Sequence, residues 1–178
     1  MKGNDLRGKT FFVTGGSGGL GRAISKLLIV RGAHITIFGR RPGPLIEARE
    51  ELLAARLDDN QQVDMVAIDM SDYTKVHEAF VSQRRTADVL YCVAGGNHAE
   101  NGFLVDIPAR ALETCMANNY FASAYAAKAI LDIWVDDDEK EGLEHPHPRV
   151  RKIVFIASAA AFLSSPGSIA YTRKSSFA

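Results

Sequence analysis

The stretch at residues 14–21 constrains this chain most, because five of its eight residues are glycine. It reads Thr-Gly-Gly-Ser-Gly-Gly-Leu-Gly and joins an apolar run at 10–14 to a stretch with helical spacing at 20–31. Such a turn opens the backbone N–H groups of a helix start to a phosphate, since no Cβ blocks the approach. The stretch therefore predicts a nucleotide-binding turn. A Walker-type phosphate loop is excluded because Arg22 and Ala23 stand where Lys and Ser or Thr would follow.

We assign the phosphate contacts to this turn. Gly15 and Gly19 allow the sharp reversal and the close approach, and Gly21 also lets the helix pack closely against the strand. The alternative of a merely flexible glycine turn is disfavoured, because the turn lies between a predicted strand and a predicted helix. The predicted phosphate-binding residues are Gly15, Ser17, Gly18, Gly19, Leu20 and Gly21.

Strand and helix patterns alternate along the rest of the chain. The predicted strands are 10–14, 33–38, 62–68, 88–93 and 151–157, and the predicted helices are 20–31, 45–57, 73–85 and 109–135. Ser71 or Asp72 is expected to cap the third helix. The alternation predicts an α/β fold, a three-layer, Rossmann-like, doubly wound parallel sheet in a single domain over residues 1–178.

The composition excludes several classes of partner. Formal net charge is zero and the isoelectric point is about 7.0, so we expect no nucleic-acid partner. The first ten residues are polar, so we expect no secretory signal, and no apolar run reaches the ~18 residues of a transmembrane helix. Cys92 and Cys115 fit no metal-binding spacing, and we expect both to be reduced.

Residues 136–148 form an acidic stretch that ends in two prolines, and we expect an exposed loop there. A metal site built from His145, His147 and the acids is disfavoured, because residues that precede proline hold the chain extended. No metal is predicted.

The spacing Gly-x-x-x-Gly-x-Gly after Thr14 resembles the short-chain dehydrogenase/reductase family. The resemblance implies carbonyl reduction in which Tyr171 donates a proton, Ser158 polarises the carbonyl and Asn119 holds a proton-relaying water. Tyr171 follows Ser158 by thirteen positions, as in the family. The family lysine belongs four residues after the tyrosine, where this chain has Ser175, and Lys174 stands one residue early. One residue rotates a helical side chain by about 100°, so the role of Lys174 departs from the family pattern.

The same resemblance, with the residue types at the strand ends, implies NADPH/NADP⁺ as cofactor. Arg40 follows the second strand where an acid would select NAD, and a guanidinium suits the 2′-phosphate of NADP, with help from Ser17. The alternative is a solvated arginine pair at a turn. Asp69 matches the family residue at the adenine, although it suits a helix cap as well. The cofactor-binding residues predicted after the strands are Arg40, Asp69, Met70, Ala94 and Gly95.

One position after the fourth strand departs from the family. The family usually has Asn-Ala-Gly there, and this chain has Val93 before Ala94 and Gly95. Valine cannot make the hydrogen bonds of an asparagine side chain. We therefore expect the sheet to be stabilised differently at this point.

Within the family the sequence resembles the 3-ketodihydrosphingosine reductases. The resemblance rests on Ala-Gly-Gly-Asn-His-Ala-Glu-Asn-Gly-Phe-Leu at 94–104 and Ile-Val-Phe-Ile-Ala-Ser-Ala-Ala-Ala-Phe at 153–162. It implies a lipid ketone substrate, 3-ketosphinganine, which is reduced to sphinganine at the cytosolic face of the endoplasmic reticulum. It also implies pairing of two copies through the long helices.

Three alternatives stay open. One is a reductase for a steroid, acyl or polyol ketone, and another is an NADPH-binding chain without turnover. The third is an unstable fragment, because the sequence ends at Ala178, before the family's last strands. We therefore expect the sheet to be incomplete at its C-terminal edge.

Overall fold

Five parallel strands form one sheet in the computed structural model, which describes residues 5–96, 102–143 and 150–159. The strands are β1 (Thr10–Thr14), β2 (His34–Gly39), β3 (Val63–Ala67), β4 (Val89–Cys92) and β5 (Lys152–Phe155). Their order is β3-β2-β1-β4-β5, and every neighbouring pair is parallel. The predicted doubly wound sheet is confirmed, and it is open rather than closed into a barrel.

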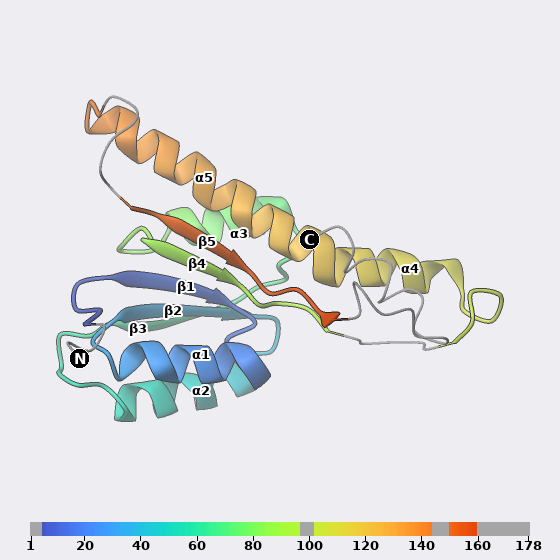
Figure 1. The fold of residues 1–178 in the computed structure, drawn as a ribbon, viewed down its shortest axis with the longest axis horizontal. Helices are drawn as coiled ribbons and strands as arrows, with labels where there is room; N and C mark the ends of the chain where they lie inside the picture. Colours follow the sequence, from blue (N-terminus) through green and yellow to red (C-terminus); the bar gives the residue numbers. More distant parts are fainter. Residues whose placement is uncertain (1–4, 97–101, 144–149, 160–178) are drawn as a thin grey trace.

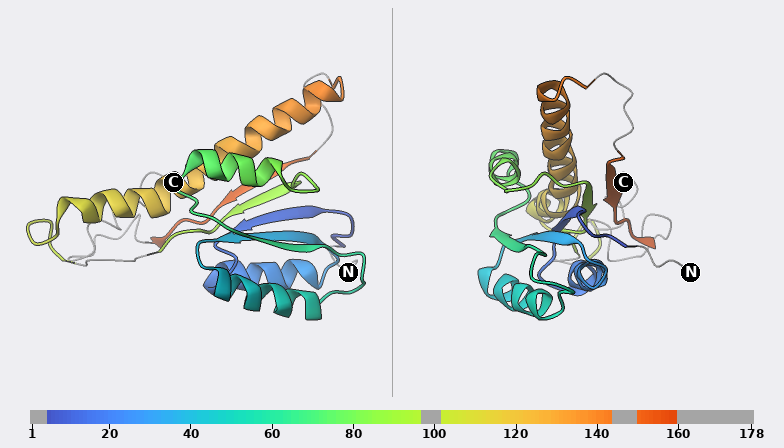
Figure 2. Two further views of the ribbon diagram at one scale, coloured as in Figure 1. Left: turned by 180° about the vertical axis from the view of Figure 1, so that it is seen from behind. Right: turned by 90° about the vertical axis from the view of Figure 1, so that its left-hand side faces the viewer.

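Helices cover both faces of this sheet, which gives three layers (Figures 1 and 2). The helices are α1 (Gly19–Ile29), α2 (Pro42–Ala54), α3 (Tyr73–Val81), α4 (Ala109–Met116) and α5 (Ala122–Lys140). Helices α1 and α2 lie on one face, and α3 and α5 lie on the other (Figure 2). Helix α4 continues into α5 through a π-helical turn at Ala117–Phe121, where the sequence predicted one unbroken helix.

Alternating side chains of β1 build the two halves of the core. Phe11 and Val13 face the cluster under α1 and α2, whereas Phe12 faces the cluster under α3 and α5. This period of two is the pleat of a strand buried on both faces. Phe12 packs edge-on against Phe38 and Phe80, with ring centroids 5.2 and 5.1 Å away. Side chains of β1 therefore pack against helices on both faces of the sheet.

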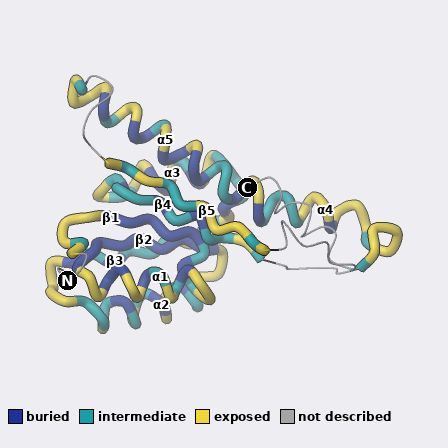
Figure 3. The backbone as a smooth tube through the Cα atoms, viewed as in Figure 1, coloured by how far each residue is buried: buried dark blue, intermediate teal, exposed yellow. Residues whose placement is uncertain are grey.

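Burial falls from the centre of the sheet towards β5 (Figure 3). Every residue of β1 and β2 is buried, whereas no residue of β5 is. Phe155 and the following Ile156 are 49% and 41% exposed, which is unusual for large apolar side chains in a parallel sheet. The loops that follow β1 and β2 thus stand on the most buried part of the sheet.

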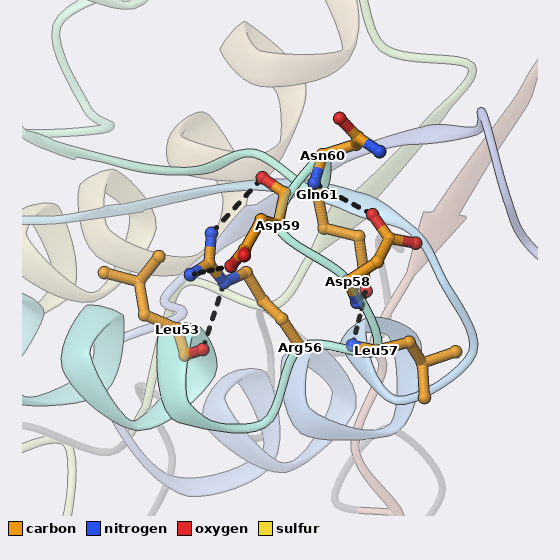
Figure 4. A network of polar contacts seen from close by, with 7 residues as sticks. All are labelled: Leu53, Arg56, Leu57, Asp58, Asp59, Asn60 and Gln61. Atoms are coloured by element: carbon orange, nitrogen blue, oxygen red, sulfur yellow. Dashed lines mark hydrogen bonds and ion pairs between the residues drawn. The ribbon is translucent and has the colours of Figure 1, made fainter.

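The connection from α2 to β3 is closed by polar side chains (Figure 4). The Gln61 side chain accepts from the backbone N–H groups of Leu57 and Asp58, and donates to the carbonyl oxygens of Ile29 and Ala33. One buried amide thereby satisfies backbone groups of two connections. Its four bonds hold the end of α2 against the end of α1.

The sequence predicted an exposed loop that begins at residue 136, and this boundary is wrong. Helix α5 continues to Lys140, and Asp138 is buried at 3% exposure. The Arg151 guanidinium bonds the Asp138 carboxylate at 2.8 Å and the Trp134 carbonyl oxygen at 2.9 Å. Part of the acidic run is therefore helical, and a cation distant in sequence compensates the buried carboxylate of Asp138. His145 and His147 lie outside the described residues.

No helix in the described ranges combines the length and the apolar character that crossing a bilayer requires.

We expect Arg151→Met to lower the free energy of unfolding by about 3 kcal/mol, because it removes the cation that compensates the buried Asp138 charge. The matched control is Lys128→Met, which removes a cation from an exposed pair with Asp132 on the same helix and should cost far less. Urea denaturation followed by circular dichroism measures both. Equal losses in the two variants would contradict a special role for the buried pair.

Candidate functional site

A pocket of about 440 Å³ opens at the carboxyl ends of the strands. It lies where the chain, having run outward through β2 and β3, returns to the other side of β1 with β4. Ligands of open α/β sheets bind at such a reversal of strand order. The lining residues are Gly15, Ser17, Gly18, Gly19, Leu20, Gly21, Gly39, Arg40, Arg41, Asp69, Met70, Val93, Ala94, Gly95, Gly96, Asn118, Ala122, Ile156, Ala157 and Ser158.

This pocket brings together every residue that the sequence assigned to the cofactor. It also brings Ser158, which was assigned to the carbonyl and follows β5. Asn119 lies beside the pocket and contacts its lining residue Gly96. Tyr171 and Lys174 lie outside the described residues.

The glycine turn is shaped by backbone that approaches backbone. Gly15 has φ of +68°, and a Cβ there would lie 3.0 Å from the Cα of Ala94. A Cβ at Gly21 would lie only 2.3 Å from the carbonyl oxygen of Gly15. Both positions therefore require glycine, for conformation at the first and for space at both.

The start of α1 is left open to a ligand. Gly18 is the N-cap residue, no side chain of the described residues caps the helix, and the first turn contains no acid. A Cβ at Gly18 would meet nothing within 4 Å, so open space lies in front of this turn. Uncompensated N–H groups at a helix start favour an anion. The turn thus fits the phosphates of a dinucleotide.

Thr14 ties the glycine turn to the end of β4. Its Oγ1 accepts hydrogen bonds from the backbone N–H groups of Val93 and Ala94, both at 3.0 Å, and donates to the carbonyl oxygen of Tyr91 at 3.4 Å. These donors are backbone groups and do not depend on the residue type at 93, so a stabilisation that differs from the family's stays a prediction. The hydroxyl thereby joins two neighbouring loops that both line the pocket.

Arg40 marks one end of the pocket, directly after β2. Its Nη1 donates a hydrogen bond to the Asn118 side-chain oxygen at 3.0 Å. Ser17 reaches the same end, because a Cβ at Gly39 would lie 3.2 Å from its Oγ. The Ser17 hydroxyl and the residue that carries the guanidinium are therefore both found where β2 ends.

Asp69 follows β3 at this same end of the pocket. Its carboxylate accepts from the backbone N–H and the hydroxyl of Ser71, at 2.9 and 2.8 Å. Burial raises the pKa of Asp69, but the two Ser71 hydrogen bonds and the Arg40 charge outweigh it and leave that pKa below its usual value. Helix α3 is capped by Asp72, one of the two caps predicted, so Asp69 is not the cap.

Asn119 holds the loop after β4. The π-helical turn buries this side chain, and its amide accepts from Gly96 N–H at 2.7 Å and donates to the carbonyl oxygens of Gly96 and Cys115. A Cβ at Gly95 would lie 2.6 Å from the Asn119 Oδ1. The side chain therefore positions the pocket wall formed by Gly95 and Gly96. A π-helical turn within a helix is a common feature of functional sites.

Sequence reasoning missed part of the lining. Asn118 and Ala122 belong to the helix that crosses the pocket, and Ile156 and Ala157 follow β5. Their signal was available in principle, because they adjoin the predicted Asn119 and Ser158. The sequence did not show which side of this helix lines the pocket, because the π-helical turn changes how the residues are arranged around the helix axis.

Fold and pocket together define a dinucleotide-binding member of a large enzyme family. The family model described as short chain dehydrogenase matches residues 9–174, which is most of the chain. The chain therefore belongs to the short-chain dehydrogenase family.

Among its relatives are several 3-ketodihydrosphingosine reductases. The one from Aspergillus fumigatus is 30% identical over 173 residues, which cover 94% of this chain and 46% of that protein. The one from Bos taurus is 29% identical over 169 residues. A PIGF/3-ketodihydrosphingosine reductase fusion protein of Schizosaccharomyces pombe is 36% identical over 123 residues and is covered to 24%. The chain spans at most about half the length of these curated relatives.

Solved structures support the fold. A short-chain type dehydrogenase/reductase from Mycobacterium ulcerans superposes with a TM-score of 0.81 at 22% identity, covering 97% of this chain and 59% of that one. An NAD⁺-bound xylitol dehydrogenase superposes with a TM-score of 0.80 at 20% identity, covering 96% and 61%.

Substitution of two glycines of the turn by alanine is expected to affect stability to different extents. We expect Gly21→Ala to lower the free energy of unfolding by roughly 1–3 kcal/mol, since its Cβ meets the Gly15 carbonyl oxygen. Gly18→Ala should change it by less than about 1 kcal/mol, because Gly18 has φ of −163° and open space around it. Chemical denaturation of both variants tests the packing, and a tolerated Gly21→Ala would refute it.

Proposed function

We propose that this chain forms the NADPH-binding part of a short-chain ketoreductase, and that its substrate is the lipid ketone 3-ketosphinganine. One observation carries the proposal. The eleven residues assigned to the cofactor from sequence line one pocket together with Ser158, the residue assigned to the carbonyl. These residues come from the ends of all five strands, which a parallel sheet brings to one edge, and together they supply a phosphate-binding turn, a cation and a hydroxyl.

The residues at the end of β2 favour NADPH over NADH. Arg40 and Ser17 offer a planar cation and a hydroxyl, both of which suit a phosphate. The carboxylate that would bind a ribose 2′-hydroxyl is absent at this turn, since Arg41 and Pro42 follow Arg40. The turn before α1 would hold the bridging phosphates, and Asp69, Met70, Ala94 and Gly95 would line the rest of the dinucleotide.

The reaction then divides between cofactor and chain. When bound, NADPH supplies the hydride for the carbonyl carbon. Ser158 would donate a hydrogen bond to the carbonyl oxygen, which stabilises the charge that grows there. Asn119 keeps the wall beside it in place, and by resemblance Tyr171 donates the proton. These roles follow the family pattern.

The choice of 3-ketosphinganine rests on the relatives from Aspergillus fumigatus and Bos taurus, which are named 3-ketodihydrosphingosine reductases. With that substrate we place the activity at the cytosolic face of the endoplasmic reticulum. Pairing of two copies through the long helices stays a prediction.

A second candidate is an NADPH-binding chain without turnover. One observation favours it, because Ser175 stands where the family lysine belongs and Lys174 lies one residue early. A lysine next to the tyrosine lowers the tyrosine pKa towards neutrality, so its displacement would slow proton transfer.

The function is tested with the purified chain, first by NADPH fluorescence and then by loss of NADPH absorbance with 3-ketosphinganine in detergent micelles. We expect saturable binding, and turnover with this ketone in preference to a steroid or a polyol ketone. Ser158→Ala should keep NADPH binding and lose turnover. Absence of any NADPH binding would overturn the proposal, whereas binding without turnover would favour the second candidate.

Cofactor choice is tested by Arg40→Asp. We expect the affinity for NADPH to fall by about tenfold or more, since a charged hydrogen-bond partner of the phosphate is lost, while the affinity for NADH holds or rises. Arg84→Asp is the matched control, because it makes the same charge change at an exposed position in the connection that leads into β4, at the opposite edge of the sheet. An unchanged ratio of the two affinities, measured by fluorescence titration, would contradict the role of Arg40.

A further inference from the structure

We propose that Asn118 is a positioning residue for NADPH, which holds the Arg40 guanidinium ready for the 2′-phosphate. The inference rests on the proposed cofactor and goes beyond it, since neither the sequence pattern nor the resemblance assigned Asn118 a role. Its basis is the hydrogen bond from Arg40 Nη1 to the Asn118 Oδ1 at 3.0 Å, made between two residues that line the same pocket.

Arg40 needs such a partner because it is exposed. A free arginine side chain samples many rotamers, and a ligand that binds it must overcome that entropy. Within the described part of the chain, the bond to Asn118 is the one hydrogen bond of the Arg40 side chain. It restricts the guanidinium before the phosphate arrives.

Asn118 is well placed to restrict it. The residue lies in the π-helical turn between α4 and α5 and is half-buried. Its neighbour Asn119 is buried and bonded to Gly96 and Cys115, so the backbone that carries Asn118 is fixed to the loop after β4. An anchor on a rigid element positions a side chain better than one on a mobile loop.

The chemistry of the anchor matters as much as its place. A neutral amide oxygen accepts one hydrogen bond and leaves the full charge of the guanidinium in place, with four of its five N–H donors. Asp69 is the competing partner, since the charge of Arg40 acts on its carboxyl. A salt bridge to Asp69 would neutralise the cation that the phosphate requires. Asn118 therefore holds Arg40 in a state that still attracts an anion.

The test is a double-mutant cycle on the purified chain, with the dissociation constants of NADPH and NADH measured by fluorescence titration. We expect Asn118→Ala to weaken NADPH binding by roughly threefold to tenfold, the worth of one hydrogen bond, and to weaken NADH binding by less. In the Arg40→Ala background, the same substitution should weaken NADPH binding no more than NADH binding. Asn60→Ala, an exposed asparagine in the loop after α2, should change neither affinity.

Each outcome decides the matter. Weakening of both cofactors alike, or weakening specific to NADPH that persists without Arg40, would show that Asn118 is merely structural and would overturn the inference. Tighter NADPH binding would overturn it too, because it would mean that Asn118 holds Arg40 away from the phosphate. A wild-type chain that binds neither cofactor would overturn the proposed function itself, and this result is distinct from the others. We expect Asn118→Ala to fold, because alanine has a high helix propensity, and circular dichroism checks this.

Discussion

The close approach of two backbones after β1 is the constraint on which the rest of this structure depends. Gly21 touches the carbonyl oxygen of Gly15, and Gly15 lies against Ala94 at the end of β4. These contacts exist because three positions lack a side chain or carry a small one. They let α1 start directly at the end of the central strand, with its N–H groups facing the pocket. Thr14 completes the arrangement by bonding the loop after β4.

Everything else in the pocket is positioned relative to that junction. The strands carry Arg40, Asp69 and Ser158 to the same edge of the sheet, because parallel strands all end on one side. The helix that crosses this edge adds amides rather than charges. Asn119 fixes the wall, and Asn118 meets Arg40. Polar groups are thus fixed by neutral partners, which leaves the charge of the arginine available for a ligand.

Much of this could be predicted from the sequence. The hydrophobic periods located all five strands, although the ends of elements moved by a few residues, as for the helix expected to begin at Leu45 that begins at Pro42. Residue types at strand ends indicated the pocket lining. The errors came where a distant partner decides. The acidic stretch was expected to be solvated, yet Arg151 compensates Asp138 and the helix continues to Lys140. No local sequence pattern predicts that a cation thirteen residues away pairs with Asp138.

By itself the sequence determined that the chain is an α/β dinucleotide-binding fold, because glycine spacing and hydrophobic period are local and follow from sterics. It also determined which residue types stand at the ends of the strands. Only the tertiary structure decided which of those residues meet. The π-helical turn rotates Asn118 towards Arg40 and buries Asn119, and the hydroxyl of Thr14 reaches a strand that is 77 residues away along the chain. Such contacts depend on how whole elements pack, and packing energies are sums over residues that are far apart in sequence.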